Sequence, residues 1–449
     1  MIKVLPKNLI DLASKLDKPL YLVGGSVRNF LLDGTLSGDL DVCASIPVEE
    51  FVCGVENCGL KVVATYPRTG TVLFVDGENH YEYTVFRRER YVGGSHTPEY
   101  TEFTDSILED ALRRDFKCNA IYYDIKNQKI EDVLGGVLDV LEKRLDTVKE
   151  PEKVFCSDGL RLMRLARFAG ELNFKPTKEV LDGAKKYAHN ILDISPERIY
   201  AELKMILKSD QKYHFSDPIG HYTALKILSE TRVLDNIFPE LTAGRGMEQR
   251  ADFHKYDVLE HSLKTVLYSS LEVRLCALLH DIGKPFCMTR DGCYHKHFSE
   301  GEKIAENVLL RLRADNETIK KIKFLVRAHM LDLDCSMGEN KVKKFIVNNF
   351  DFIEDLFKLK QADFMAGLEQ EGVAPTITRW RNIIENMKKD GVPFGFKDLQ
   401  ITAADLIKIG YKGRAIGKML DEMLDYYISN PEQNKKEKLL KKAQKAFMK

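Results

Sequence analysis

The residues in this chain with the clearest capacity for chemistry lie in one stretch, residues 21–41. A short apolar run ends at a Gly-Gly-Ser turn, and helical sequence follows the turn. This order directs backbone N–H groups and the positive end of a helix dipole toward one point, which suits a phosphate group. We therefore expect a triphosphate to be bound by Gly24, Gly25, Ser26 and Arg28.

Two carboxylates follow on a segment that alternates polar and apolar residues, as a strand does. Asp39 and Asp41 stand two apart, so their side chains leave a strand on the same face. Glu82, on a second alternating segment, could join them. Two Mg²⁺ ions held by such acids could activate a hydroxyl and neutralise a leaving pyrophosphate. The alternative is a glycine turn and a solvated acidic strand, but the glycines, the arginine and both aspartates together favour a nucleotide site.

These residues also resemble a known family. GGSVRNFLLDG followed by GDLD is similar to the head of the class II tRNA nucleotidyltransferases, which are the CCA-adding enzymes and bacterial poly(A) polymerases. The family usually has aspartate where this chain has Asn29, so one acid near the site is missing. The resemblance implies an α+β fold: a nucleotidyltransferase head with a small mixed sheet, then an elongated all-helical neck, an HD-type body and a tail.

The elements that must position the head residues can be predicted from the pattern of apolar residues. Strand-like runs occur at residues 61–65, 71–75, 81–86 and 119–124, separated by glycines or charged turns. The head should therefore contain one sheet. The glycine-rich segment 88–103 is expected to be a mobile loop, with a plain surface connection as the alternative.

A basic motif lies late in the head. Arg113 and Arg114 could clamp phosphate oxygens with their guanidinium groups, while Asp115 and Asn119 contact a ribose hydroxyl. Alone, the Arg-Arg-Asp run is more typical of a surface salt bridge. The motif resembles the one with which the family recognises ribose, and this favours the nucleotide interpretation.

A second candidate motif lies in the helical sequence that starts near residue 155. Asp158 and Arg161 are three apart, and on one helix this spacing makes them neighbours. An acceptor beside a guanidinium donor matches the amino group and bare ring nitrogen of cytosine and adenine, but not guanine or uracil. The pair would select CTP and ATP without a nucleic-acid template. The alternative is an ordinary helix ion pair.

The same motif resembles the base-selecting motif of the family. Arg164 and Arg167 follow on the helix as they do in the family, so we place them in the nucleotide site. The first acid of the family motif is Ser157 here, and the choice or order of bases could therefore differ.

Histidines cluster in the second half of the chain, where six of the eleven lie between residues 254 and 329. His and Asp side chains from several helices could bind one or two divalent metal ions. The set resembles an HD phosphohydrolase domain, and the resemblance implies as ligands His261, His280, Asp281, His297, His329 and Asp363. Such a domain could also retain its ligands for structure alone.

The composition is that of an ordinary globular protein without a membrane-spanning segment. The 449 residues are 44% hydrophobic, and 68 basic side chains balance 68 acidic ones, so RNA would be bound by local basic surface rather than by net charge. The nine cysteines include no CxxC pair, and no signal or membrane-spanning run is present. These features predict a cytoplasmic protein with reduced thiols and no membrane association.

We divide the chain into a nucleotidyltransferase head (1–145), a nucleotide-selecting neck (146–210), an HD body (211–370) and a tRNA-binding tail (371–449). The expected activity is addition of C, C and A to tRNA 3′ ends from CTP and ATP, with Mg²⁺ in the head and a second divalent metal in the HD site. The alternatives are a specialised A-adding or CC-adding enzyme, a poly(A) polymerase, an HD-type phosphohydrolase acting on RNA ends, and a non-catalytic tRNA-binding protein.

Overall fold

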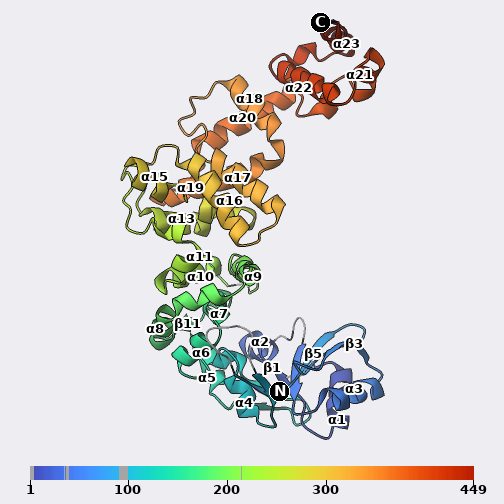
Figure 1. The fold of residues 1–449 in the computed structure, drawn as a ribbon, viewed down its shortest axis with the longest axis vertical. Helices are drawn as coiled ribbons and strands as arrows, with labels where there is room; N and C mark the ends of the chain where they lie inside the picture. Colours follow the sequence, from blue (N-terminus) through green and yellow to red (C-terminus); the bar gives the residue numbers. More distant parts are fainter. Residues whose placement is uncertain (1–4, 35, 37–39, 91–99, 214, 449) are drawn as a thin grey trace. The chain divides into compact units, whose positions relative to one another are not determined.

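The computed structural model describes residues 5–34, 36, 40–90, 100–213 and 215–448. These residues form two compact units. The first is Met1–Pro239, blue to yellow-green in Figure 1, together with Arg311–Arg313. The second is Glu240–Leu310 with Ala314–Lys449, yellow-green to red.

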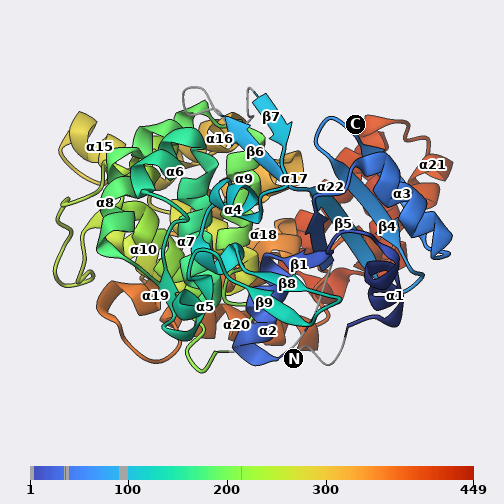
Figure 2. The ribbon, with the colours of Figure 1, turned by 90° about the horizontal axis from the view of Figure 1, so that it is seen from below.

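A seven-stranded sheet in the order β3-β4-β5-β2-β1-β8-β9 organises the first unit. Its strands are β1 (Tyr21–Val23), β2 (Leu40–Ala44), β3 (Lys61–Tyr66), β4 (Thr71–Val75), β5 (His80–Val85), β8 (Tyr122–Asp124) and β9 (Lys129–Glu131). Strands β2 and β5 are parallel and the other neighbours antiparallel, so the sheet is mixed. Helix α3 (Val48–Asn57) packs on β3 and β4 (Figure 2). The predicted α+β head is confirmed.

Two of the strand and loop predictions need correction. The run at 119–124 is a strand only over its second half, because a 3-10 turn, η1 (Lys117–Asn119), takes up its start. The loop expected at 88–103 is wrong at both ends, where β6 (Arg87–Arg90) pairs with β7 (Tyr100–Phe103). An ion pair of 2.5 Å between Arg88 and Glu102 joins these two strands. Residues 91–99 lie outside the described residues.

Helices make up most of the remainder of the first unit. They are α1 (Lys7–Lys15), α2 (Gly25–Asp33), α4 (Ile107–Leu112), α5 (Gly136–Leu141), α6 (Pro151–Ser157), α7 (Leu160–Leu172), α8 (Lys178–Lys186), η2 (Ala188–Asp193), α9 (Pro196–Ile206), α10 (Gly220–Glu230) and α11 (Val233–Ile237). The short helix α12 (Pro239–Thr242) starts at the last residue of this segment, and its other residues belong to the second unit. The neck is not entirely helical, because β10 (Arg144–Leu145) pairs with β11 (Lys175–Pro176). Helix α7 packs against α10 at Gly170, where a Cβ atom would lie 2.3 Å from the Gly220 carbonyl oxygen. Only glycine permits this approach.

The second unit is helical in its described residues. Its elements are α13 (Val258–Tyr268), η3 (Leu271–Val273), α14 (Arg274–Leu279), α15 (Lys284–Asp291), α16 (His297–Arg311), α17 (Asn316–Ala328), α18 (Glu339–Asn348), α19 (Phe350–Leu368), α20 (Pro375–Lys389), η4 (Phe396–Asp398), α21 (Ala403–Ile409), α22 (Arg414–Ser429), η5 (Pro431–Gln433) and α23 (Lys436–Phe447). Helix α13 packs against α14 and α19, which brings the histidine-bearing segments together. Within the described part of the chain, none of the helices combines the length and apolarity needed to cross a bilayer.

Candidate nucleotide and metal sites

The Gly-Gly turn between β1 and α2 brings three charged side chains to one place. Gly24 has φ +74°, a conformation that glycine adopts without strain. A Cβ atom at Gly24 would lie 3.5 Å from Asp41 Oδ2 and 3.8 Å from Arg114 Nη1. A Cβ atom at Gly25 would lie 3.5 Å from Arg28 Nη2. The bare backbone therefore lies close to one carboxylate and two guanidinium groups, at the N-terminus of a nine-residue helix.

Two acids lie side by side on the sheet next to this turn. Asp41 on β2 is the register partner of Glu82 on the parallel strand β5, and both side chains are exposed. Register partners on adjacent strands point to the same face, with the strands about 4.8 Å apart. Like charges in this arrangement repel unless a cation lies between them. The pair therefore fits a divalent metal site. Asp39, the other predicted ligand, lies outside the described residues.

A buried aspartate that the sequence analysis missed organises the basic motif. Asp110 accepts hydrogen bonds from Arg113 (2.7 Å), Arg114 (3.1 Å) and the hydroxyl of Tyr122 (2.7 Å). Burial opposes ionisation of Asp110, but the charges of Arg114 and Arg113 outweigh it and lower its pKa to about 2. Asp110 thus fixes both arginines. Asp110 lies on α4, three residues before Arg113 and four before Arg114, and this spacing is the signal that could have identified it.

The rest of the basic motif connects the head to helix α7. Asp115 accepts from the Asn119 amide at 3.1 Å and from Arg164 Nη2 at 2.6 Å. Burial opposes its ionisation, but the charge of Arg164 and the Asn119 hydrogen bond hold the pKa of Asp115 well below its usual range. The Asn119 side-chain oxygen in turn accepts from Arg28. Ser26 is buried on the first turn of α2. The structure therefore links Arg28 of the predicted triphosphate residues to Asn119 and Asp115 of the predicted ribose residues.

The expectation that Asp158 and Arg161 share a helix is wrong. Helix α6 ends at Ser157 and α7 begins at Leu160, so Asp158 lies in the link between them in extended conformation. Its carboxylate accepts from the Leu160 backbone N–H at 2.9 Å, which is a typical way to begin a helix.

Arg161 is buried on α7 and is positioned by groups from both sides of this link. It donates to the Ser157 hydroxyl at 3.1 Å and to the Arg113 carbonyl oxygen at 2.6 Å. The serine that replaces the family's acid therefore contacts the arginine directly. Whether Asp158 and Arg161 read a base remains a prediction.

Arg167, like Arg164, is paired with carboxylates, but it pairs with two of them and both are buried. Its side chain is 8% exposed and pairs with Glu202 at 2.7 Å and with Glu171 at 3.1 Å. Its guanidinium also lies 4.3 Å from the centre of the Phe168 ring. These contacts favour a role in joining α7 to α9 over the predicted contact with nucleotide.

Replacing Arg167 by methionine is expected to lower the free energy of unfolding by about 3–5 kcal/mol, because Glu202 would stay buried without its partner and Glu171 would keep only the longer contact with Lys212. Chemical denaturation measures this change. Lys186→Met is the matched control, since its ion pair with Glu152 is exposed and worth about 0–1 kcal/mol. Equal losses in the two variants would contradict the assigned role.

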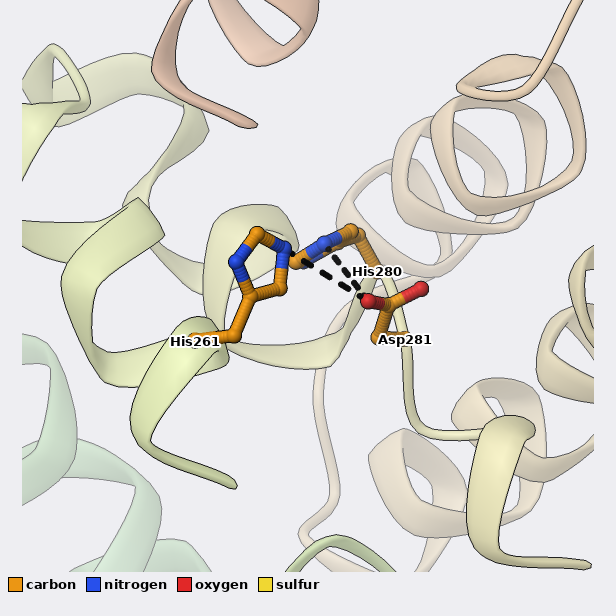
Figure 3. A group of neighbouring side chains, drawn as sticks. All are labelled: His261, His280 and Asp281. Carbon is orange, nitrogen blue, oxygen red and sulfur yellow. Dashed lines mark ion pairs between the residues drawn. The ribbon is translucent and has the colours of Figure 1, made fainter. Parts of the chain in front are cut away.

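The histidine cluster of the second unit forms two overlapping groups of potential metal ligands. The first consists of His261 on α13 and of His280 and Asp281 at the end of α14 (Figure 3). Asp281 Oδ2 lies 3.2 Å from His280 Nε2 and 3.6 Å from His261 Nε2. Asp363 on α19 lies 3.0 Å from His261 Nε2, through its Oδ1. Asp363 Oδ1 also lies 3.7 Å from His280 Nε2, so it adjoins both histidines of this three-residue group.

The second group shares Asp281 with the first. Asp281 Oδ1 lies 3.2 Å from His297 Nε2 and 3.6 Å from His329 Nε2, and all three side chains are buried. One carboxylate that reaches two sets of histidines suits a pair of metal ions that it bridges.

Hydrogen bonds fix the histidine rings in the form that binds metal. His280, His297 and His329 each donate from Nδ1 to the carbonyl oxygen three residues earlier, at 2.8, 2.8 and 2.7 Å. This leaves each Nε2 facing the cluster, as second-layer hydrogen bonds do around bound metals. Burial lowers the pKa of His329 to about 4. Against the effect of burial, the charge of Asp281 raises the pKa of His280 to about 10, so a proton competes there with a cation.

A lysine that the sequence analysis missed completes this cluster. Lys284 is buried, and its ammonium lies 2.6 Å from Asp281 Oδ2 and 2.6 Å from the side-chain oxygen of Gln249. Its spacing of three residues from Asp281 could have indicated the contact. Gln249, 32 positions upstream of Asp281, carries no such signal.

Comparison with protein families matches three consecutive parts of the chain. Residues 20–146 match the poly A polymerase head domain, residues 173–244 match the "probable RNA and SrmB- binding site of polymerase A", and residues 258–351 match the HD domain. The order is that of the predicted head, neck and body. Asp363 lies beyond the end of the HD match.

Similar curated proteins are CCA-adding enzymes. That of Bacillus pumilus (strain SAFR-032) is 33% identical over 252 residues, which are 55% of this chain and 58% of that protein. That of Ligilactobacillus salivarius (strain UCC118) is 37% identical over 193 residues, 43% of this chain and 46% of that protein. The chain thus matches about half the length of these relatives. The predicted resemblance to CCA-adding enzymes is therefore confirmed over these parts of the chain.

Solved structures of CCA-adding enzymes share the fold. The Bacillus stearothermophilus enzyme in complex with CTP has a TM-score of 0.66 at 20% identity, covering 98% of this chain and 97% of that one. The Thermotoga maritima enzyme complexed with tRNA has a TM-score of 0.63 at 18% identity, covering 99% and 97%. The fold likeness therefore extends over nearly the whole chain, beyond the sequence matches.

Proposed function

We propose that this protein is a tRNA nucleotidyltransferase that adds C, C and A to tRNA 3′ ends. The observation that carries this function is the Gly24–Gly25 turn, which lies against Asp41, Arg28 and Arg114. The head and RNA-binding matches support it, as do relatives that are CCA-adding enzymes. The specialised A-adding or CC-adding enzyme and the poly(A) polymerase remain alternatives, because the turn binds any nucleoside triphosphate.

In the proposed reaction the terminal hydroxyl of the tRNA attacks the α-phosphorus of CTP or ATP, and pyrophosphate leaves. The glycine turn and Arg28 bind the triphosphate, and Arg114 adds a second positive charge. Asp41 and Glu82, with Asp39 proposed as a third ligand, hold Mg²⁺. Bound there, Mg²⁺ supplies charge to the attacking and leaving oxygens. Asp115 and Asn119 fix the sugar end of the nucleotide site.

We place base selection at the link between α6 and α7. The Asp158 carboxylate caps α7, and Arg161 is fixed by Ser157 and the Arg113 carbonyl. Because Arg113 belongs to the basic motif, the base-reading arginine is tied to the residues that place the sugar. We keep as predictions the four domains with the limits 1–145, 146–210, 211–370 and 371–449. We also propose that the last of them, the tail, binds tRNA and that the protein acts in the cytoplasm.

The test is nucleotide incorporation into tRNA that ends at the discriminator base, with labelled CTP and ATP supplied separately and together. We expect two C residues from CTP alone, and the full CCA end only when both nucleotides are present. An A-adding enzyme would instead extend only tRNA that already ends in CC, and a poly(A) polymerase would produce long A tails. Binding of tRNA without nucleotide incorporation would indicate that the protein is a non-catalytic tRNA-binding protein.

The two ligand groups that share Asp281 favour a second activity. We propose metal-dependent hydrolysis of phosphate esters at RNA ends, with Lys284 beside the metal ligands to bind a phosphate oxygen. A domain that retained its histidines only for packing would not need the Nε2 atoms of both His297 and His329 turned toward the same carboxylate.

Turnover of a 2′,3′-cyclic nucleotide phosphate tests this second activity. His280→Ala with Asp281→Ala is expected to abolish turnover and to leave nucleotide incorporation intact, whereas Asp41→Asn is expected to do the opposite. His297→Gln provides a milder variant that keeps Asp281. Equal turnover by the wild type and the His280→Ala, Asp281→Ala protein would remove this activity from the histidine site.

A further inference from the structure

Arg28 is a buried arginine with an unusual set of partners. Its side chain is 2% exposed, and among the described residues its hydrogen bonds go to three uncharged oxygens. These belong to Asn119, to Asn29 (3.0 Å) and to the hydroxyl of Tyr213 (3.4 Å). Its Nε atom is buried without a hydrogen-bond partner. A buried guanidinium is costly when, as among the described residues here, no carboxylate pairs with it, so the environment of Arg28 suits an anion that arrives later.

Tyr213 reaches this arginine from a distant part of the sequence. It lies in the link between α9 and α10, and Lys212 beside it pairs with Glu171 of α7 at 3.5 Å. The Tyr213 hydroxyl donates to the Asn29 side-chain oxygen at 2.6 Å. Lys212 and Tyr213 therefore hold this link against α7 and α2, which contribute residues to the proposed nucleotide site.

The three hydrogen bonds among Arg28, Asn29 and Tyr213 can form together in only one orientation of the Asn29 side-chain amide. The Asn29 oxygen accepts from both the Tyr213 hydroxyl and the Arg28 guanidinium, and the Tyr213 oxygen accepts from Arg28. In the reversed orientation the Asn29 NH₂ group would face the guanidinium, donor against donor. The Arg28 guanidinium thus decides which end of the amide faces it, and the Tyr213 hydroxyl donates to the same amide oxygen.

We propose that Tyr213 and Asn29 are positioning residues that hold Arg28 in place for the triphosphate without neutralising its charge, an inference that rests on the proposed function. Asparagine supplies the oxygen that a carboxylate would supply, but it leaves the full positive charge for the ligand. The guanidinium lies against Gly25 of the turn, so in the proposed site its charge would act on the triphosphate rather than on the base. The binding of CTP and the binding of ATP should therefore depend on Tyr213 and Asn29 to the same extent.

Tyr213→Phe, which keeps the ring, is expected to raise KM for CTP and for ATP by the same factor, about five-fold, with kcat changed by less than about two-fold. Asn29→Asp is expected to raise both KM values by about ten-fold or more, because a carboxylate 3.0 Å from Arg28 would compete with the triphosphate. In an Asn29→Ala background, Tyr213→Phe should change KM by less than about two-fold. Tyr187→Phe, on the neck away from the site, is the matched control.

Calorimetric binding of inorganic tripolyphosphate gives a readout that does not require catalysis. Weaker binding by Tyr213→Phe and Asn29→Asp would support the inference even if the wild type incorporated no nucleotide, in which case only the proposed function would fail. The inference is overturned if a wild type that incorporates nucleotide binds tripolyphosphate no more tightly than these variants. A fall in kcat with unchanged KM, or different factors for CTP and ATP, would also overturn it.

Discussion

An Asp41→Asn protein is expected to incorporate CMP into tRNA at least about 100- to 1,000-fold more slowly than the wild type. The amide keeps the shape of the carboxylate but offers no negative oxygen to a cation beside the glycine turn. Because Asp41 and Glu82 are register partners, Glu82→Gln should lower kcat in the same direction. Single-turnover incorporation at saturating CTP measures the effect on the chemical step.

The matched control for this prediction is Glu56→Gln, which removes an exposed carboxylate from helix α3 of the same unit. Its rate should equal that of the wild type. An Asp41→Asn rate within about three-fold of the control would show that this carboxylate carries none of the stabilisation expected of a metal ligand.

An Asp281→Asn protein is expected to bind divalent metal in the second unit at least about 100-fold more weakly, because one carboxylate serves both ligand groups. At a metal concentration 100 times the wild-type Kd, bound metal should stabilise the wild-type fold by about 2.7 kcal/mol per site. The Asp281→Asn variant should gain almost no stability from the metal at the same concentration. Metal titration by calorimetry, and denaturation with and without Mn²⁺, measure both effects.

This comparison must be made as the difference with and without metal, because Asp281→Asn also leaves the buried ammonium of Lys284 without its partner at 2.6 Å. Asp291→Asn, an exposed carboxylate on α15, is the control and should bind metal as the wild type does. Undiminished metal binding by Asp281→Asn would contradict the bridging role.

Local spacing predicted the parts of the sites that depend on nearby residues. The strand, glycine turn and helix around Gly24 were visible because each element has a short-range signal in the sequence. The end of α14 before His280 also has a short-range signal, since glycine and proline follow at positions 283 and 285. The α+β fold class followed from the strand-like runs and the family resemblance together.

Contacts between distant residues could not be predicted in this way. Tyr213 meets Asn29 across 184 positions, and nothing in either local sequence indicates the other. The helix proposed for Asp158 was wrong because Asp158 caps the next helix instead of continuing the previous one, and aspartate favours that capping position. Arg167 fitted the motif spacing, but Glu202 from another helix compensates its charge.

The most direct test of the central claim is a crystal structure of the protein with Mn²⁺ and a non-hydrolysable CTP analogue. We expect anomalous density for a metal bonded to Asp41, the triphosphate along Gly24 and Gly25, and the Arg28 guanidinium on a phosphate oxygen. A triphosphate bound elsewhere, or a metal that Asp41 does not touch, would contradict the account.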